Sequence, residues 1–366
     1  MDWQSANPHT QSAIHNPQSA IGLGGAVRIA VVGGGAWGTA LADLLARKGA
    51  SQAVTLWARE PDVVDGINRA HVNPVFLPGA ALDHSLRASG DLAETVRGAD
   101  VVVSSAPSHV VREVMGRAGA ALSRGAFVVS VSKGLEPERL TTLSCVLGEV
   151  LPRGVPVAVL SGPSFAQEVY QQQPTAVVAA AQDHGVAQRV QQVFSTNYFR
   201  VYSHTDVLGV ELGGALKNVI ALAAGILEGL GLGHNTRAAL LTRGLAEITR
   251  LGVALGAEPA TFAGLAGMGD LILTATGPLS RNRSLGVELA RGTALADALA
   301  GRASVAEGVN TARAAVTLGA RHEVELPIAG QVAEVLFGGK PPRQAVADLM
   351  ERELKAEQWS GGGKER

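Results

Sequence analysis

The sequence predicts an α/β domain built on a doubly wound sheet, followed by an all-α domain. From Arg28 to about Tyr202, short continuous apolar runs alternate with helical segments. After about Ser203 the strand pattern stops, and long segments with a period of 3.6 residues take its place. The first apolar run also leads directly into a glycine-rich turn and a helix, which is the usual start of a nucleotide-binding sheet.

Seven apolar runs are the predicted strands. They are continuous in Val, Ile, Leu and Ala instead of alternating with polar residues, so we expect strands that are covered on both faces, as in a parallel sheet. Helical segments such as Ala36–Lys48 and Gly185–Phe194 would supply the crossovers. The runs are Ile29–Val32, Ala53–Trp57, Val101–Ser104, Phe127–Val131, Val155–Leu160, Ala176–Ala180 and Phe199–Tyr202.

The sequence pattern of the second half predicts a series of helices. Several of them begin at Asp, Thr, Asn or Pro and end at Gly. With 366 residues the chain is long enough for about two domains. We place these domains at 27–203 and 204–355, between a disordered tail at 1–26 and a mobile tail at 356–366. The predicted helices are Asp206–Leu230, Thr236–Leu255, Asn282–Arg291, Glu307–Leu318, Pro327–Phe337 and Pro342–Glu351.

Composition excludes several classes of protein. Hydrophobic residues make up 46% of the chain and charged residues 17%, which is typical of a globular protein. The formal net charge of −1 gives no general attraction for nucleic acid or an anionic membrane. The single cysteine, Cys145, excludes a disulfide framework and fits a cytoplasmic location. Residues 1–26 contain no Lys or Arg, unlike a signal or transit peptide.

The most apolar stretch, Val207–Leu232, has the length of a membrane span. It contains three charged residues, Glu211, Lys217 and Glu228, which are too many for a bilayer core. We therefore expect a buried helix and no membrane insertion.

The first predicted strand runs into Gly-Gly-Gly-Ala-Trp-Gly, residues 33–38, and then into a helix. This is the GxGxxG pattern in the strand–turn–helix context that dinucleotide sites require, so we expect a Rossmann-type domain. Gly33 would make the tight turn, Gly35 would let the pyrophosphate approach the backbone, and Gly38 would let the helix and strand pack closely. The helix N-terminus would then hold the phosphates.

The residues after the second predicted strand bear on the choice between NAD and NADP. NAD-preferring sites usually carry an acidic residue about 20 positions after the glycines. Here that place holds Trp57 or Ala58, and Arg59 follows, a cation that can pair with a 2′-phosphate. The sequence therefore favours NADPH. Two alternatives stay open: Arg59 is a solvated surface residue, or Glu60 binds the ribose and both coenzymes are used.

Three residues are candidates for chemistry. Lys133 follows a predicted strand at the sheet edge where such folds bind ligands, although a lysine at the start of a loop can equally be surface charge. Lys217 lies about ten residues into an apolar helix among small residues. It either extends outward to solvent or is buried, with a pKa lowered by desolvation and by a like charge. Asp270 is either a helix cap or part of the site.

A helix start provides a candidate phosphate site. Ser280, Arg281, Asn282 and Arg283 follow Gly-Pro, and Ser280 is expected to cap the helix. Backbone N–H groups, a hydroxyl and two guanidinium groups would form a phosphate cradle, and the alternative is a capped helix with solvated arginines. His109 is a further candidate acid, but its place in a loop beside the nucleotide site favours a role in ordering that loop.

Six motifs occur in order between about residues 28 and 350: GGGAWGTAL (33–41), NPVFLPG (73–79), SKGLE (132–136), SGPSFA (161–166), GGALKNV (213–219) and SRNR (280–283). In this combination the chain closely resembles the bacterial NAD(P)-dependent glycerol-3-phosphate dehydrogenases. Several of the motifs are specific to that family, so the set is a stronger signal than the glycine pattern alone.

The resemblance implies the reversible reduction of dihydroxyacetone phosphate to sn-glycerol 3-phosphate. Hydride would pass from the nicotinamide to the carbonyl carbon, while Lys217 donates a proton to the ketone oxygen and no metal takes part. The substrate would be bound by Lys133, Gly162, Ser164, Lys217, Asp270, Ser280, Arg281 and Asn282. The cofactor, NADP or NAD, would be bound by Gly33, Gly35, Ala36, Trp37, Gly38, Arg59, Lys133, Ala166, Arg281, Val305 and Glu307.

The chain departs from the family pattern in two places. Ala36 stands where many relatives have Ser, which removes a hydroxyl but keeps the backbone donors, and Ala306 stands where many have Val. The resemblance also implies a cytoplasmic homodimer that feeds glycerophospholipid synthesis. Two other interpretations stay open: an enzyme for another hydroxy acid, similar to the 6-phosphogluconate dehydrogenase relatives, and a non-catalytic NAD(P)H-binding sensor.

Overall fold

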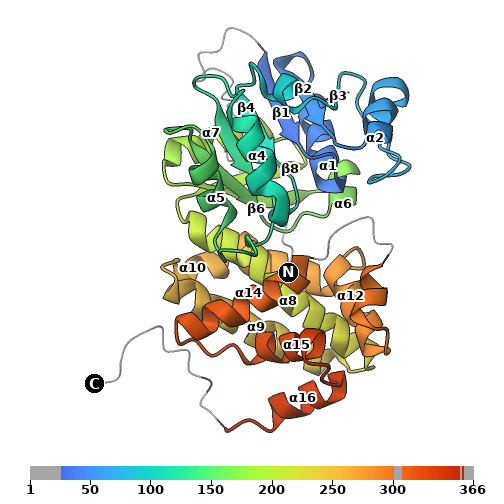
Figure 1. Cartoon of the computed structure of the whole chain (residues 1–366), viewed down its shortest axis with the longest axis vertical. Coiled ribbons are helices and arrows are strands. Elements are labelled where there is room, and N and C mark those ends of the chain that lie inside the picture. Colours follow the sequence, from blue (N-terminus) through green and yellow to red (C-terminus); the bar gives the residue numbers. More distant parts are fainter. Residues whose placement is uncertain (1–25, 301–306, 355–356, 358–366) are drawn as a thin grey trace, which may run out of the picture.

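A computed structural model describes residues 26–300, 307–354 and 357 of the chain. A sheet covered by helices forms one half of the molecule, and helices alone form the other half (Figure 1). The predicted fold class is therefore confirmed. The predicted tails, 1–26 and 356–366, lie almost entirely outside the described residues.

The sheet has eight strands in the order β3-β2-β1-β4-β5-β6-β7-β8. From β1 the chain moves to one side through β2 and β3, and then returns to β4 on the other side of β1. Sheets of this kind bind ligands outside the carboxyl ends of the strands, at the point where the order reverses. The strands are β1 (Val27–Val32), β2 (Gln52–Trp57), β3 (Arg87–Ser89), β4 (Val101–Ser104), β5 (Phe127–Ser130), β6 (Val157–Ser161), β7 (Thr175–Ala181) and β8 (Phe199–His204).

Both faces of the central strands are buried, which explains their continuous apolar runs, whereas the edge strand β8 alternates between buried and exposed residues. In β1, Ile29 and Val31 join one hydrophobic core, whereas Ala30 and Val32 join a second core on the opposite face. The helical segments of this half are α1 (Ala36–Ala46), η1 (Gly49–Ser51), α2 (Pro61–Asp65), η2 (Gly66–Ala70), α3 (Leu92–Val96), η3 (Ser108–Val110), α4 (Val111–Gly119), α5 (Leu143–Val150), α6 (Ala166–Tyr170) and α7 (His184–Phe194).

Two features of the sheet differ from the prediction. β7 runs antiparallel to β6, so the expectation of a wholly parallel sheet is wrong at this pair. Residues 162–174 between them contain only the short α6. The chain therefore starts β7 at the edge of the sheet where β6 ends, instead of crossing back to the edge where β6 began. The sequence also does not predict β3, because a three-residue edge strand is too short to produce a hydrophobic pattern.

α8 is the central helix of the second half. It is long and apolar enough to cross a membrane, yet its most apolar window is entirely buried within the protein, as predicted for a core helix. Glycines let α12 approach it closely: a Cβ at Gly286 would lie 2.2 Å from the carbonyl oxygen of Leu222. The helical segments are α8 (Val207–Gly229), α9 (His234–Ala254), α10 (Pro259–Phe262), η4 (Leu265–Gly269), α11 (Asp270–Thr276), α12 (Arg281–Ala290), α13 (Leu295–Leu299), α14 (Glu307–Arg321), α15 (Pro327–Phe337) and α16 (Pro342–Met350).

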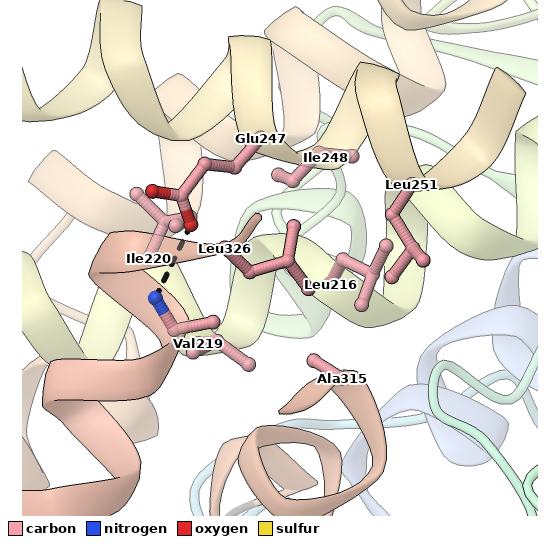
Figure 2. A pocket seen from close by; sticks show the side chains of 9 residues that line it. Leu216, Val219, Ile220, Glu247, Ile248, Leu251, Ala315 and Leu326 are labelled. Atoms are coloured by element: carbon pink, nitrogen blue, oxygen red, sulfur yellow. Dashed lines mark hydrogen bonds between the residues drawn. The ribbon is translucent and has the colours of Figure 1, made fainter. Parts of the chain in front are cut away.

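A buried carboxylate ties α9 to α15. Glu247, only 4% exposed, accepts hydrogen bonds from the backbone N–H groups of Ile328 (2.7 Å) and Ala329 (3.2 Å), in the first turn of α15. Burial raises the pKa of this carboxyl to about 7. Figure 2 shows the carboxylate beside a small cavity whose other lining residues are apolar: Leu216, Val219, Ile220, Ile248, Leu251, Ala315, Leu326 and Ala329.

Candidate active site

The turn between β1 and α1 has the shape that a pyrophosphate requires. Gly33 has a φ of 127°, and a Cβ there would lie 2.8 Å from the carbonyl carbon of Ser105, in the loop after β4. A Cβ at Gly38 would lie 2.0 Å from the carbonyl oxygen of Gly33. At Gly35, leaving aside the residues next to it in the chain, no atom of the described residues lies within 4 Å of where a Cβ would project. Close packing at the first and third glycines, with open space at the second, fits a bound dinucleotide.

Two further residues predicted to bind the cofactor lie near this turn. Ala36 and Trp37 begin α1, and the indole Nε1 of Trp37 is buried without a hydrogen-bond partner among the described residues. A buried N–H group without an acceptor is rare in folded proteins, so it suits a ligand oxygen.

Arg59 follows β2 and is 83% exposed, and its guanidinium lies 2.9 Å from the carboxylate of Glu60. Arg59, the residue predicted to select the coenzyme, is therefore accessible to a 2′-phosphate, but the carboxylate of Glu60 already pairs with it. Both alternatives drawn from the sequence, a solvated Arg59 and a ribose-binding Glu60, stay open.

Lys217, Asp270 and Lys133 converge at the carboxyl edge of the sheet. The ammonium group of Lys217 donates hydrogen bonds to Oδ1 of Asp270 and, at 2.7 Å, to the hydroxyl of Thr274. The ammonium group of Lys133 donates to Oδ2 of Asp270 and to the carbonyl oxygen of Gly162, both at 2.8 Å. One carboxylate thus holds two ammonium groups, one from each half of the molecule.

The cluster is shielded from solvent, and this changes its acid–base properties. The side chains of Lys217, Asp270 and Lys133 are 5%, 1% and 19% exposed. Burial lowers the pKa of Lys217 to about 7; Asp270 opposes this shift, and the charge of Lys133 adds to it. The interpretation of Lys217 as an outward-extending side chain is wrong. So is that of Asp270 as a simple helix cap, because its carboxylate binds the lysines.

Small residues bring Lys217 to the sheet edge. A Cβ at Gly214 would lie 2.6 Å from the hydroxyl oxygen of Ser161, at the end of β6. A Cβ at Gly213 would lie 2.6 Å from the carbonyl oxygen of Ala266, in η4. Larger side chains at these positions would push α8 away, so the glycines before Lys217 allow its ammonium group to reach Asp270.

The loop after β6 carries three more predicted site residues. Gly162 has a φ of 138°, and its carbonyl oxygen accepts hydrogen bonds from Lys133 and, at 3.0 Å, from the hydroxyl of Ser164. Gly162 and Ser164 therefore lie directly beside the lysine cluster. Ala166 begins α6, two residues further on.

The predicted substrate residues at the start of α12 have different surroundings. Ser280 caps the helix, since its hydroxyl accepts the backbone N–H of Arg283 at 3.2 Å. Asn282 is buried; its amide donates to Oδ1 of Asn218 (2.9 Å) and accepts the backbone N–H of Gly308 (3.0 Å). These bonds join α12 to α8 and α14. Arg281 is exposed at the first position of α12.

Arg283 does not fit the predicted phosphate cradle. Its guanidinium group donates to the carboxylate of Glu228 (3.0 Å) and to the carbonyl oxygen of Gly277 (3.2 Å). The expectation that two arginines face a phosphate is therefore wrong, because the helix turns the second side chain toward α8. This contact concerns Arg283 alone and leaves the prediction for Arg281 unchanged.

Glu307 connects α14 to the loop after β4. Its carboxylate accepts hydrogen bonds from the backbone N–H (3.0 Å) and hydroxyl (2.5 Å) of Ser108. A Cβ at Gly134 would lie 3.0 Å from the same carboxylate, which places Glu307 over the loop that carries Lys133. Val305, predicted to bind the cofactor, lies outside the described residues. His109 is exposed in η3.

Sequence patterns do not single out Thr274 or Asn218, although both lie in the site. Thr274 is four residues after Asp270, so helical spacing alone would have placed the two on one face. Asn218 directly follows Lys217 and reaches Asn282 across the helix interface. Within the part of the chain that the structure describes, no group of three or more His, Cys, Asp and Glu side chains is arranged to hold a metal ion.

Comparisons with known proteins agree with this geometry. Residues 28–187 match the sequence model of the NAD-dependent glycerol-3-phosphate dehydrogenase N-terminus, and residues 206–347 match that of its C-terminus. The chain is 54% identical to the glycerol-3-phosphate dehydrogenase [NAD(P)+] of Geobacter sp. (strain M21) over 334 residues, which cover 91% of this chain and 99% of that protein. The chain belongs to the NAD-dependent glycerol-3-phosphate dehydrogenase family.

Solved structures place the chain in the same family. The glycerol-3-phosphate dehydrogenase of Coxiella burnetii matches it with a TM-score of 0.85 and 39% identity, over 89% of this chain and 99% of that one. A D-mandelate dehydrogenase, at 10% identity and a TM-score of 0.59, shares the fold alone. The resemblance seen in the six motifs is confirmed, and this glycerol-3-phosphate dehydrogenase family member is a nicotinamide-dependent oxidoreductase.

Proposed function

We propose that the protein catalyses the reversible reduction of dihydroxyacetone phosphate to sn-glycerol 3-phosphate, with NADPH as the preferred coenzyme. The observation that carries this proposal is the buried cluster of Lys217, Asp270 and Lys133 at the carboxyl edge of the sheet. Lys133 follows β5, two strands from the glycine turn that follows β1. At a strand spacing of about 4.8 Å, the cluster and the turn are about 10 Å apart across the sheet, a distance that a dinucleotide spans.

Lys217 acts as the proton donor. When bound, the reduced nicotinamide supplies the hydride that adds to the carbonyl carbon. Lys217 donates two of its three N–H groups to Asp270 and Thr274, so one N–H remains to donate to the carbonyl oxygen. A pKa of about 7 suits the transfer of this proton to the developing alkoxide, and its return in the reverse reaction.

Lys133 and Asp270 support this step. Lys133 also uses two of its N–H groups within the protein, on Asp270 and Gly162, and its remaining N–H stabilises the charge on the same oxygen. Asp270 orients both ammonium groups and compensates their charge, without which two buried cations would repel each other.

The phosphate of the substrate is held at the start of α12. The N-terminus of this ten-residue helix carries a partial positive charge, and Ser280, Arg281 and Asn282 add polar and cationic groups. Asn282 is hydrogen-bonded to Asn218, the residue after Lys217, so the anchor and the proton donor are held at a fixed separation. Anchoring the phosphate would present the carbonyl to Lys217.

The remaining assignments follow from the family and from the fold. The cofactor is bound between the glycine turn with Arg59 and the segments that carry Ala166, Arg281 and Glu307. The protein acts as a cytoplasmic homodimer, and its product feeds glycerophospholipid synthesis. The names of its relatives specify NAD(P)+ and glycerol 3-phosphate, and they support the nicotinamide cofactor among these assignments.

Oxidation of NADPH by the purified protein, with dihydroxyacetone phosphate as substrate, tests the proposal. We expect turnover with this substrate, and none with 6-phosphogluconate and NADP+, the pair expected for the alternative enzyme class. Binding of NADPH without turnover of either substrate would contradict the proposed function and favour a sensor.

A further inference from the structure

We propose that Asn73 is a positioning residue for the cofactor: it fixes the peptide between Gly34 and Gly35 so that the N–H of Gly35 faces the pyrophosphate. The inference rests on the proposed cofactor site and adds a residue to it that lies some 40 positions from the glycine turn in sequence. It also gives a role to the segment NPVFLPG (73–79), which the proposed mechanism does not use.

The carbonyl oxygen of Gly34 is held by two side chains. Asn73 is completely buried, and its Nδ2 donates one hydrogen bond to this oxygen and a second to Oγ1 of Thr39, both at 2.8 Å. The hydroxyl of Thr39 in turn donates to the Gly34 oxygen at 3.2 Å. Gly34, Thr39 and Asn73 therefore form a closed set of hydrogen bonds beneath the turn.

The loop that carries Asn73 determines which way its amide faces. Oδ1 of Asn73 accepts the backbone N–H groups of Val75 (3.2 Å) and Phe76 (3.0 Å). Only an oxygen can accept two N–H donors, so the NH2 group must lie on the opposite side, toward Gly34. The amide thus links a rigid turn of its own loop to the glycine turn.

Holding one end of a peptide orients its other end. The Gly34–Gly35 peptide is trans and planar, so its N–H points opposite to its C=O. Because the carbonyl points toward Asn73, the N–H of Gly35 points away from it. Gly35 is the N-cap of α1, where backbone N–H groups have no acceptor within the helix and are available to an anion.

This restraint matters because both residues are glycine. A peptide between two glycines meets little steric resistance to rotation, since neither residue has a Cβ. Without Asn73, the turn would sample orientations in which a carbonyl, not an N–H, faces the phosphates. Asn73 would thereby reduce the entropy lost when the cofactor binds.

Asn73→Asp tests the inference by equilibrium binding. An aspartate has the same shape but no N–H donors, and it would face the Gly34 carbonyl with an acceptor. We expect the Kd for NADPH to rise about tenfold or more, which is the effect of losing the hydrogen bond from the Gly35 N–H to a charged phosphate. Adenosine 2′-monophosphate, which has no pyrophosphate, should bind as to the wild type.

Three further variants make the test decisive. Thr39→Val removes the second donor and Thr39→Ser keeps it, so only the valine variant should bind NADPH more weakly; this pair decides the outcome if Asn73→Asp does not fold. Asn68, which exchanges two hydrogen bonds with the backbone of Ala88 at the edge strand, is the matched control, and Asn68→Asp should bind NADPH normally.

Three results would overturn the inference. They are unchanged NADPH affinity in folded Asn73→Asp, an equal loss of NADPH and adenosine 2′-monophosphate binding, or identical NADPH affinities of the two Thr39 variants. Because no substrate is added, these outcomes do not depend on whether dihydroxyacetone phosphate is turned over, which tests the proposed function separately.

Discussion

Lys217 and Asp270 form an ion pair between α8 and α11 in which the two side chains are only 5% and 1% exposed. Burying such a pair costs desolvation energy, which the pair recovers only with good geometry and further hydrogen bonds. Thr274 and Lys133 provide those bonds. The pair is therefore a poor source of stability, and it is burial, opposed by Asp270, that lowers the pKa of Lys217 to about 7.

Replacing Lys217 should separate catalysis from cofactor binding. In Lys217→Met we expect turnover to fall by 10²–10⁴-fold or more, the range for loss of a general acid, while the Kd for NADPH stays near the wild-type value. Steady-state rates and a fluorescence titration measure the two effects. Lys48→Met is the control, because Lys48 donates to three backbone carbonyls at the end of α7, and it should lose stability but retain turnover.

The two directions of the reaction should depend oppositely on pH. Reduction needs protonated Lys217 and oxidation needs the neutral amine, and the pKa of this group is lowered to about 7. We therefore expect kcat/KM for dihydroxyacetone phosphate to fall as the pH rises through about 7, and kcat/KM for glycerol 3-phosphate to rise. In Asp270→Asn both midpoints should move to lower pH, since Asp270 raises the pKa of Lys217. Midpoints unaffected by this change would argue against Lys217 as the titrating group.

Arg59 and Glu60 should control coenzyme preference in opposite directions. Arg59→Ala should weaken NADPH by about tenfold and NADH little, because only NADPH offers the guanidinium a 2′-phosphate. Glu60→Gln removes the carboxylate that pairs with Arg59 and should strengthen NADPH slightly, since exposed ion pairs contribute only about 0.2–1 kcal/mol. Kd values for both coenzymes check this, and equal weakening of the two in Arg59→Ala would contradict it.

The two arginines at the start of α12 should have different roles. We expect Arg281→Ala to raise the KM for dihydroxyacetone phosphate by about tenfold or more, because a charge-assisted contact with the phosphate is lost. Arg283→Ala should instead lower the thermal midpoint, since Arg283 binds Glu228 and the end of α11. Kinetics and thermal unfolding of both variants measure this difference, and an unchanged KM in Arg281→Ala would mean that the phosphate binds elsewhere.

Glu247 should make the folded state less stable as the pH rises. Its pKa is about 7 in the folded protein, against an ordinary value of 4.5. Between these two pH values the folded protein therefore holds a proton on Glu247 that the unfolded protein has lost. The stability from this group is complete below pH 4.5 and is lost as the pH rises through 7, by up to about 3 kcal/mol. Urea unfolding between pH 5 and 8 should show a shallower pH dependence in Glu247→Gln, and an identical slope would contradict the assignment.

The sequence by itself determined the parts of this protein that depend on neighbouring residues. Apolar runs predicted seven of the eight strands, because the central strands are covered on both faces and have few polar positions. The glycine turn, the Ser280 cap and the buried character of α8 follow from local patterns in the same way. The motifs were enough to indicate the family, since each one is a short segment with a defined role.

Only the tertiary structure decided which distant groups meet. Lys217 and Lys133 lie 53 and 137 residues from Asp270, and no local pattern shows that one carboxylate binds both. The pairing of Arg283 with Glu228, the antiparallel β7 and the contact of Asn73 with Gly34 were equally absent from the sequence patterns. Hydrophobic periodicity and helix capping depend on interactions within one strand or one helical turn. The burial and pairing of a charge depend instead on how separate helices and strands pack against one another.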